Sequence, residues 1–220
     1  MKKTLIAALL CFALLSGQAF AFTFEKLEPS DVFSPEIIEQ ERVSEWAENE
    51  IELARQAGLI TEHTSDYMTR SITRFQFAEL IVNLAEKVTG KEIVPAADST
   101  FTDCTETVVL KAYAAGIVSG IGDNRFAPDT TTNREQIAAM IYRAVAYINA
   151  QATKPLALEK ADVSKFTDQA QVSSWALEGM GTLAANGIMA GTSATTLSPK
   201  NACTVEQSIL LVYRLYQKAS

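Results

Sequence analysis

The chain has 220 residues, of which 48% are apolar, and its 26 Asp and Glu residues outnumber 19 Lys and Arg residues, for a net charge of −7. An apolar content this high favours a packed core over a disordered chain, and the length suits one substantial domain or two small ones. The acidic balance argues against nucleic acid or an anionic membrane as a partner held by the overall electric field.

The first 21 residues, MKKTLIAALLCFALLSGQAFA, are typical of a signal peptide. Two lysines precede an apolar stretch over residues 5–15, and Ala19-Phe20-Ala21 matches the cleavage pattern of signal peptidase. We therefore expect a secreted protein that begins at Phe22. Removal of the two lysines leaves 17 basic against 26 acidic residues, so the mature chain would carry a net charge of −9.

No later stretch is apolar over the length that a bilayer requires, so we expect no membrane span. Residues 22–43 form a preface in which Ser34-Pro35-Glu36 has the cap and the proline of a short helix start. The rest of the chain consists of three similar segments, residues 44–95, 98–155 and 160–220, which we interpret as tandem repeats.

Each segment opens with a predicted helix that ends at a glycine followed by a branched apolar residue. These pairs are Gly58-Leu59, Gly116-Ile117 and Gly187-Ile188. The pattern is typical of a Schellman ending, in which glycine takes the left-handed conformation and the next side chain folds back on the last turn. Twelve residues before the glycines stand Trp46, Cys104 and Trp175. We predict both tryptophans to be core anchors, because large aromatic side chains of amphipathic helices are mostly buried.

Each segment closes with a second predicted helix, which follows a structured loop. The helix starts read ITRFQ, TNREQ and CTVEQ, so a cap residue is followed three positions later by glutamine in every copy. These capping boxes pair Thr73 with Gln76, Asn133 with Gln136, and Thr204 with Gln207. Apolar residues then recur at the spacing of a helix that is buried on one side. The expected fold class is therefore all-α, with three helix–loop–helix units packed as one pseudo-threefold domain.

The residue directly after the cap is Arg74, Arg134 or Val205. An arginine at the positive end of a helix dipole costs about 0.3–1 kcal/mol unless a negative group lies nearby. A helix N-terminus offers free N–H groups, and a guanidinium adds a planar fork that suits a carboxylate, so together they would form an anion site without a metal. The alternative is that these arginines are solvated or pair with a neighbouring aspartate, such as Asp103, Asp129 or Asp168.

The order of these motifs resembles the S-layer homology (SLH) domain of bacterial cell-surface proteins. A helix, GIVSG, FAPD and a T-R-A-E-like helix start recur with variations in three copies over residues 44–220, behind a signal peptide. The resemblance implies an all-helical trimer of repeats that docks non-covalently on a secondary cell-wall polysaccharide, often one with pyruvate ketals. It also implies that the arginine of the T-R-A-E motif lies in a groove between repeats and holds the acidic sugar.

The three copies depart from the family pattern to different degrees. Glutamine replaces the glutamate of the T-R-A-E motif in all of them. The second copy alone keeps both glycines of GIVSG together with the arginine, so Gly116, Gly120 and Arg134 form the best-preserved candidate site. The first copy keeps Arg74 without the second glycine, and the degenerate third copy has Val205 in place of arginine. We therefore expect two working grooves at most.

Two aspartates and two cysteines complete the set of candidate residues. Asp103 and Asp168 follow Phe-Thr in the second and third copies, and we predict that they cap helices, with a ligand role for Asp103 as the less favoured interpretation. Cys104 and Cys203 are the cysteines of the mature chain, and they either form a disulfide or remain two buried thiols.

No pattern in the sequence points to catalysis, a cofactor or a metal site. His63 is the only histidine, the cysteines lack metal-ligand spacing, and no serine lies in a nucleophile elbow. Our first hypothesis is a secreted, non-catalytic module at the cell wall or cell surface that binds an acidic polysaccharide. The alternative is a structural protein of the envelope or surface layer whose degenerate repeats contact other proteins, because the chain holds little besides the three copies.

Overall fold

A computed structural model describes residues 42–220 of the chain. The predicted signal peptide, residues 1–21, and the short helix predicted near Ser34 lie outside the described residues. Within residues 42–220 the regular secondary structure is helical, and the extended backbone forms isolated bridges but no strand. The predicted all-α class is therefore confirmed. No helix in this range combines the length and the apolar character that crossing a membrane would require.

Six α-helices of the described range form three helix–loop–helix units. The first helices of the units are α2 (Glu48–Gln56), α4 (Thr107–Ala114) and α6 (Leu177–Ala185). The second helices are longer, and they are α3 (Arg74–Thr89), α5 (Arg134–Gln151) and α7 (Val205–Ala219). Single 3-10 turns, η2 (Glu62–Thr64), η3 (Asp98–Thr100), η4 (Gln169–Gln171) and η5 (Ser174–Ala176), lie in the connections. We number the units one to three in chain order.

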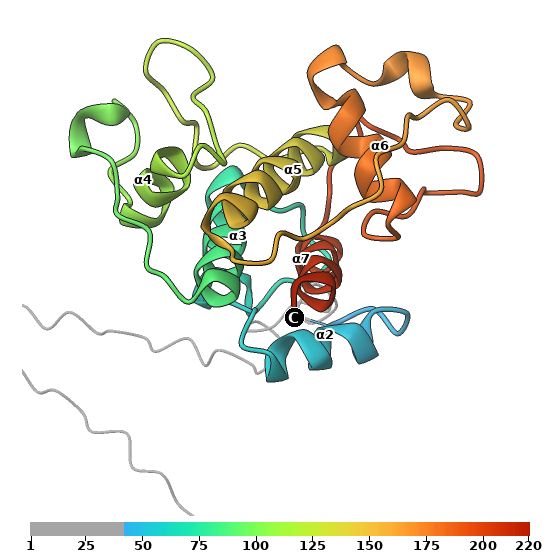
Figure 1. Cartoon of the computed structure of the whole chain (residues 1–220), viewed down its shortest axis with the longest axis horizontal. Coiled ribbons are helices and arrows are strands. Elements are labelled where there is room, and N and C mark those ends of the chain that lie inside the picture. The colour runs from blue at the N-terminus through green and yellow to red at the C-terminus, as the bar shows by residue number, and fades with distance from the viewer. Residues whose placement is uncertain (1–41) are drawn as a thin grey trace, which may run out of the picture. The chain divides into compact units, whose positions relative to one another are not determined.

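The three long helices lie together and the short helices pack around them (Figure 1). Each short helix packs mainly against the long helix of the preceding unit, so that α4 lies on α3 and α6 lies on α5. The three units form a closed ring by the same arrangement, because α2 of unit one lies on α7 of unit three. Since no unit covers its own apolar stripe, the core is shared by all three units.

The apolar stripes of the long helices form the centre of this core. Phe77 and Leu80 of α3 and Ile137 and Ile141 of α5 are fully buried, as the helical spacing predicts. Burial of a side chain of this size contributes about 1.5–3 kcal/mol. The corresponding stripe of α7 includes the buried Ser208, whose hydroxyl donates to the Thr204 carbonyl at 2.8 Å. That bond lets a polar residue occupy a core position.

The predicted ends of the short helices are confirmed. Gly58, Gly116 and Gly187 have φ angles of 65°, 70° and 69°, a conformation that strains any residue with a Cβ atom. The N–H of Leu59 bonds back to the Ala54 carbonyl at 3.0 Å, and Leu59 is fully buried. Equivalent bonds follow the other two glycines, so each unit turns from its first helix into its loop in the same way.

The prediction that the tryptophans are core anchors is wrong. Trp46 and Trp175 are 60% and 53% exposed, whereas the adjacent Ala47 and Ala176 are fully buried. Successive residues of a helix differ in direction by about 100°, so only one of two neighbours can face the core. Because the small alanine faces the core at both helix starts, each tryptophan is turned to the outside.

All three predicted capping boxes are present. The side chains of Thr73, Asn133 and Thr204 accept the N–H of the glutamine three positions later, and each glutamine side chain returns a bond to the N–H of its cap residue. A single cap of this kind contributes about 1 kcal/mol. The three long helices therefore start by one local mechanism, which does not involve the arginines.

Two buried glutamates connect the long helices to the short helices that pack on them. Glu206 of α7 is 3% exposed and accepts the N–H and the hydroxyl of Ser44 at 3.0 and 2.8 Å. Glu135 of α5, also 3% exposed, makes the same two bonds to Ser173 ahead of α6, both at 3.0 Å. The corresponding residue of α3 is Phe75, so the start of α3 lacks this carboxylate contact.

Candidate functional site

The start of each long helix is a joint between two units. The N–H groups of Arg74 and Phe75 donate to the carbonyls of Thr130 and Pro128 in the loop of unit two, at 2.9 and 3.0 Å. Matching bonds run from Arg134 to Asn201, from Glu135 to Pro199, from Val205 to Arg70 and from Glu206 to Met68. The capping box takes the next N–H. The expectation of free N–H groups at these helix starts is therefore wrong, because loop carbonyls of the next unit occupy them.

The arginine side chains clamp the same loops. Arg74 donates from Nε to the Phe126 carbonyl at 2.9 Å and from Nη2 to the Ser119 carbonyl at 3.1 Å. Arg134 makes the matching bonds to the carbonyls of Leu197 at 2.7 Å and Ala190 at 2.6 Å. Neither arginine forms an ion pair with an aspartate of the described range. The alternative that they pair with a neighbouring aspartate is therefore wrong. Four carbonyl dipoles offset the unfavourable position of the two cations.

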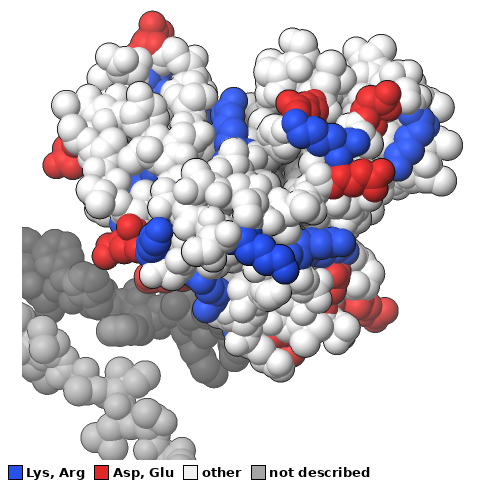
Figure 2. Space-filling model, viewed as in Figure 1, with Lys and Arg blue, Asp and Glu red and all other residues white. Residues whose placement is uncertain are grey.

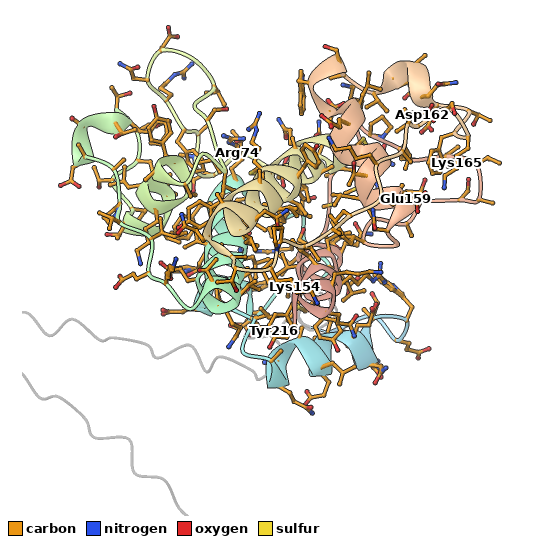
Figure 3. The ribbon with its side chains drawn as sticks, in the orientation of Figure 1. Arg74, Lys154, Glu159, Asp162, Lys165 and Tyr216 are labelled. Carbon is orange, nitrogen blue, oxygen red and sulfur yellow. The ribbon has the colours of Figure 1, made fainter. Side chains whose placement is uncertain are left out.

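Both arginine residues are nearly buried, with Arg74 8% and Arg134 7% exposed. Burial lowers the pKa of Arg74, but the guanidinium stays charged at neutral pH because an arginine side chain is not deprotonated in proteins. Nη1 of Arg74 makes no hydrogen bond within the part of the chain that the structure describes, and the side chain enters the space between α4 and α5 (Figure 3). This amino group remains available to an external acceptor.

Asp103 and Asp168 hold loops, and the prediction that they cap helices is wrong. The Asp103 carboxylate accepts the N–H groups of Phe126 and Ala127, both at 2.8 Å. Asp168 does the same for Leu197 at 2.9 Å and Ser198 at 2.7 Å. Phe126 and Leu197 are also the residues whose carbonyls receive the arginine Nε. Each aspartate therefore positions the loop segment that the arginine of the preceding unit binds.

These bonds change the acidity of both carboxyl groups. The N–H of Phe126 is the largest cause that lowers the pKa of Asp103. Partial burial acts to raise the pKa of Asp168, but the N–H groups of Leu197 and Ser198 outweigh it and lower the pKa. Both groups therefore remain ionised under all but acidic conditions.

The first groove lies where three units meet. Its volume is about 270 Å³, and it is lined by Arg74 of unit one, by the loop and helix α5 of unit two, and by Trp175 of unit three. The loop contributes Ser119 and Gly120, and α5 contributes Gln136 and Arg143. Figure 2 shows Lys and Arg side chains in the hollow between the parts of the molecule that carry α4 and α6. No carboxylate lines the groove.

The second groove repeats this construction one unit further along. Its volume is about 300 Å³, and it is lined by Arg134 of unit two, by Gly191, Gln207 and Arg214 of unit three, and by Trp46 of unit one. Gln207 and Arg214 occupy the same positions in α7 as Gln136 and Arg143 in α5. The two grooves are therefore matched sites, each built from all three units.

The candidate residues Gly116, Gly120 and Arg134 do not come together. Gly120 lies in the first groove with Arg74, whereas Arg134 lies in the second groove with Gly191. A Cβ atom at Gly120 would stand 2.9 Å from the Arg125 carbonyl, so the close turn of the loop requires glycine. Gly116 ends α4 and lines neither groove. Each groove takes its arginine from one unit and its glycine from the next.

Sequence reasoning missed four residues of the grooves, namely Trp46, Trp175, Arg143 and Arg214. A signal for the two arginines was present, because each follows the capping glutamine by seven residues, which is two helical turns on the same face. The helical pattern of the sequence assigns both tryptophans to the core, although they lie on the surface. Their shared place in units one and three was the signal for a repeated surface role.

The third position of the ring, which we define by Val205, Asn83 and Cys104, carries different chemistry. Val205 replaces the groove arginine, Asn83 stands where α5 has Arg143, and Cys104 stands where the other units have tryptophan. The Asn83 amide donates to the Gly58 carbonyl at 3.0 Å, and the Gln76 amide donates to the His63 carbonyl at 2.7 Å. In the two grooves the corresponding polar side chains line the hollow. At the third position they form hydrogen bonds within unit one instead.

Cys104 and Cys203 are free and buried, so the structure shows two thiols and no disulfide between them. Burial raises the pKa of the Cys203 thiol to about 11, although the nearby Arg134 acts to lower it. A thiol of this kind stays protonated and unreactive at neutral pH. Within residues 42–220, no three His, Cys, Asp or Glu side chains gather in a way that could hold a metal ion.

A larger hollow, of about 630 Å³, lies at the opposite ends of the long helices. The last turns of α3, α5 and α7 border it together with Lys91, Lys154 and Lys218 (Lys154 is labelled in Figure 3). Cations at helix C-termini suit the negative end of the helix dipole, so these lysines have a role in the fold itself. The hollow lacks the aromatic side chain and the guanidiniums of the two grooves.

A model of the S-layer homology domain matches residues 102–138 and 165–206, which contain the loops and long-helix starts of units two and three. The chain is also similar to three curated proteins. Exoglucanase XynX of Acetivibrio thermocellus is 24% identical over 203 residues, an endoglucanase of Bacillus sp. (strain KSM-635) is 28% identical over 160 residues, and an amylopullulanase of Thermoanaerobacterium thermosulfurigenes is 25% identical over 181 residues. These matches cover 88%, 73% and 79% of this chain but only 17%, 16% and 9% of the relatives.

Proposed function

The chain contains S-layer homology segments, which associate proteins with the cell surface, and from this premise we propose that it is a secreted, non-catalytic wall-binding module. Its ligand in this proposal is an acidic secondary cell-wall polysaccharide, for example one that carries pyruvate ketals. The first and second grooves are the binding sites. Export through the predicted signal peptide, residues 1–21, is part of the same proposal.

One observation carries the proposal, which is the repeated chemistry of the two grooves. Each groove places two guanidinium groups, a glutamine amide and an exposed tryptophan around a hollow of about 270–300 Å³. An exposed aromatic ring can stack on the apolar face of a sugar, and a guanidinium suits a carboxylate. The glutamine keeps its NH₂ group for a hydroxyl, because its Oε1 accepts the N–H of the cap residue at 3.1 to 3.2 Å.

A binding role also agrees with what the grooves lack. The lining of neither groove contains an Asp or Glu side chain, whereas hydrolysis of a glycosidic bond generally uses a pair of carboxyl groups. The relatives have the names of glycan-cleaving enzymes, but this chain spans less than a fifth of their length. We therefore propose that the chain corresponds to a part of these proteins that binds and does not cleave.

Sedimentation with purified cell walls tests the proposal. We expect the protein to pellet with intact walls and to remain in solution after the wall polysaccharide has been extracted. The double variant Trp46→Ala/Trp175→Ala should bind at least about tenfold more weakly, because stacking contributes of the order of 1 kcal/mol or more at each site. Tyr113→Ala, which removes an exposed aromatic side chain outside the grooves, should bind like the unchanged protein.

Two outcomes would contradict the proposal. Binding that survives both polysaccharide extraction and the double substitution would place the contact elsewhere and indicate a protein partner. An equal loss of binding in Tyr113→Ala and in the tryptophan variant would show that the grooves contribute no more to binding than other parts of the surface. Circular dichroism on each variant separates loss of binding from loss of fold.

A further inference from the structure

We propose that the two grooves select sugars of different charge, so that the first groove takes an acidic sugar and the second groove takes an uncharged one. This inference rests on the proposed function and deepens it. It comes from a difference in charge between two similarly built sites, which lies in the arginine seven residues after the capping glutamine, Arg143 in the first groove and Arg214 in the second.

Arg214 of the second groove is already neutralised. Its Nε donates to Glu50 Oε1 at 3.0 Å and its Nη2 donates to Glu50 Oε2 at 2.6 Å, so the carboxylate takes both arms of the guanidinium fork. Both side chains are less than a third exposed. A carboxylate that bound to Arg214 would have to displace Glu50 and then lie beside it. Two like charges at one guanidinium repel each other, so Arg214 disfavours a carboxylate ligand, and Arg134 is the remaining guanidinium in the lining of this groove.

Arg143 of the first groove has no such partner. Among residues 42–220 it forms neither a hydrogen bond nor an ion pair, and its half-buried side chain lines the groove together with Trp175. The buried Arg74 adds a second guanidinium to the lining of this groove. The first groove therefore presents two positive charges without a carboxylate in its lining, a field that favours an anion.

The missing carboxylate has a structural cause. Glu50 follows Trp46 by four residues, and the position that follows Trp175 by four residues is Gly179. A Cβ atom at Gly179 would stand 3.2 Å from the Ala138 carbonyl and 3.2 Å from Cβ of Tyr142, because α6 packs closely on α5. No side chain fits there without a shift of the helices. The neighbouring Glu178 bonds to Lys160 at 2.7 Å.

Tryptophan fluorescence can report ligand binding to each groove separately. The chain has two tryptophans, and one lies in each groove. In Trp46→Phe the remaining fluorescence reports the first groove, and in Trp175→Phe it reports the second. The probes are short fragments released from the wall polysaccharide, used in their native form and after chemical reduction of their carboxyl groups to alcohols. The two probes then differ in charge and keep the same sugars.

The expected result is a difference between the reporters. The first-groove reporter should bind the native fragments at least about tenfold more tightly than the reduced ones, and salt should weaken this preference. The second-groove reporter should bind both forms within about twofold. In the Trp175→Phe background, Glu50→Gln should free Arg214 and give the second groove a preference for the native form. In the Trp46→Phe background, Arg143→Gln should remove that preference from the first groove.

A failure of the proposed charge selection can be distinguished from a failure of the proposed binding sites. If both reporters prefer the native fragments equally, or if the fragments carry no carboxyl groups, the selection by charge is overturned while the grooves remain binding sites. If neither reporter responds although the protein pellets with walls, the proposed sites themselves are wrong. Retained helical circular dichroism in each variant shows that a lost preference does not reflect unfolding.

Discussion

The first groove and the third position of the ring have the same backbone and different side chains. At both places two N–H groups of a long-helix start donate to carbonyls of the next unit's loop, and a capping box holds the helix. Arg74 and Trp175 then build a groove, whereas Val205 and Cys104 do not provide a charge or an exposed ring. The backbone joint therefore holds the ring together, and the arginine adds a loop clamp and a surface for a ligand.

The largest effect on stability is expected at the joint between units three and one, which has no groove arginine. Glu206→Ala at the third position should lower the free energy of unfolding by about 2–4 kcal/mol, because the N–H and hydroxyl of Ser44 lose a buried charged acceptor. Urea unfolding followed by circular dichroism measures the change. Glu52→Ala, on the exposed face of α2, is the control. A loss below about 0.5 kcal/mol, as for an ordinary surface substitution, would show that the ring closes without this contact.

A smaller effect on stability is expected when Arg74 of the first groove is replaced by valine, the residue that stands at the third position. Arg74→Val removes two side-chain hydrogen bonds to loop carbonyls and should lower stability by about 1–3 kcal/mol, while α3 keeps its cap and its helical circular dichroism. Arg143→Val removes a groove arginine without such bonds and should leave stability within about 0.5 kcal/mol. Equal losses in the two variants would contradict the assignment of Arg74 as a clamp.

Acid should loosen the loops of the grooves. The pKa of Asp103 and of Asp168 is lower in the folded than in the unfolded chain, so each group adds stability above its ordinary pKa and loses it as the pH falls through the lowered value. We therefore expect the amides of Phe126 and Leu197 to lose protection against hydrogen exchange below about pH 4. The amide of Leu59, whose acceptor is a backbone carbonyl, is the internal control. Unchanged protection at pH 3 relative to pH 6 would contradict this role of the aspartates.

The smallest effect on stability is expected from the exposed tryptophans. Trp46→Phe and Trp175→Phe should each change the free energy of unfolding by less than about 0.5 kcal/mol, because both side chains are more than half exposed. Thermal unfolding measures the change, with Phe77→Leu in the buried stripe of α3 as a contrast. A large loss in either tryptophan variant would restore the core role that the sequence suggested.

Features encoded by neighbouring residues could be predicted from the sequence. A cap and a glutamine three positions later define a helix start, and a glycine with a branched residue after it defines a helix end, so both follow from a few adjacent letters. The helical spacing of Phe77 and Leu80, or of Ile137 and Ile141, identifies the face that is buried. These local signals are sufficient for the all-α class and for the three units.

Features that depend on contacts between units could not be predicted in the same way. Arg74 meets Gly120 only because each unit's loop folds onto the preceding unit, and a comparison of copies suggests instead that Arg134 belongs with Gly120. Asp103 has a sequence neighbourhood that suits a helix cap, but its carboxylate binds a loop that begins more than twenty residues later. The ion pair of Glu50 with Arg214 joins units one and three and has no sequence signal at all.

We propose that the polysaccharide binds in grooves that all three units build. The most direct test is a two-dimensional ¹⁵N–¹H NMR titration of the labelled protein with polysaccharide fragments, in which the two indole N–H signals and the amides of Gly120 and Gly191 are followed. We expect these signals to shift while the amides of Asn83 and Val205 at the third position do not. Shifts centred on the third position, or on the hollow lined by Lys91, Lys154 and Lys218, would contradict it.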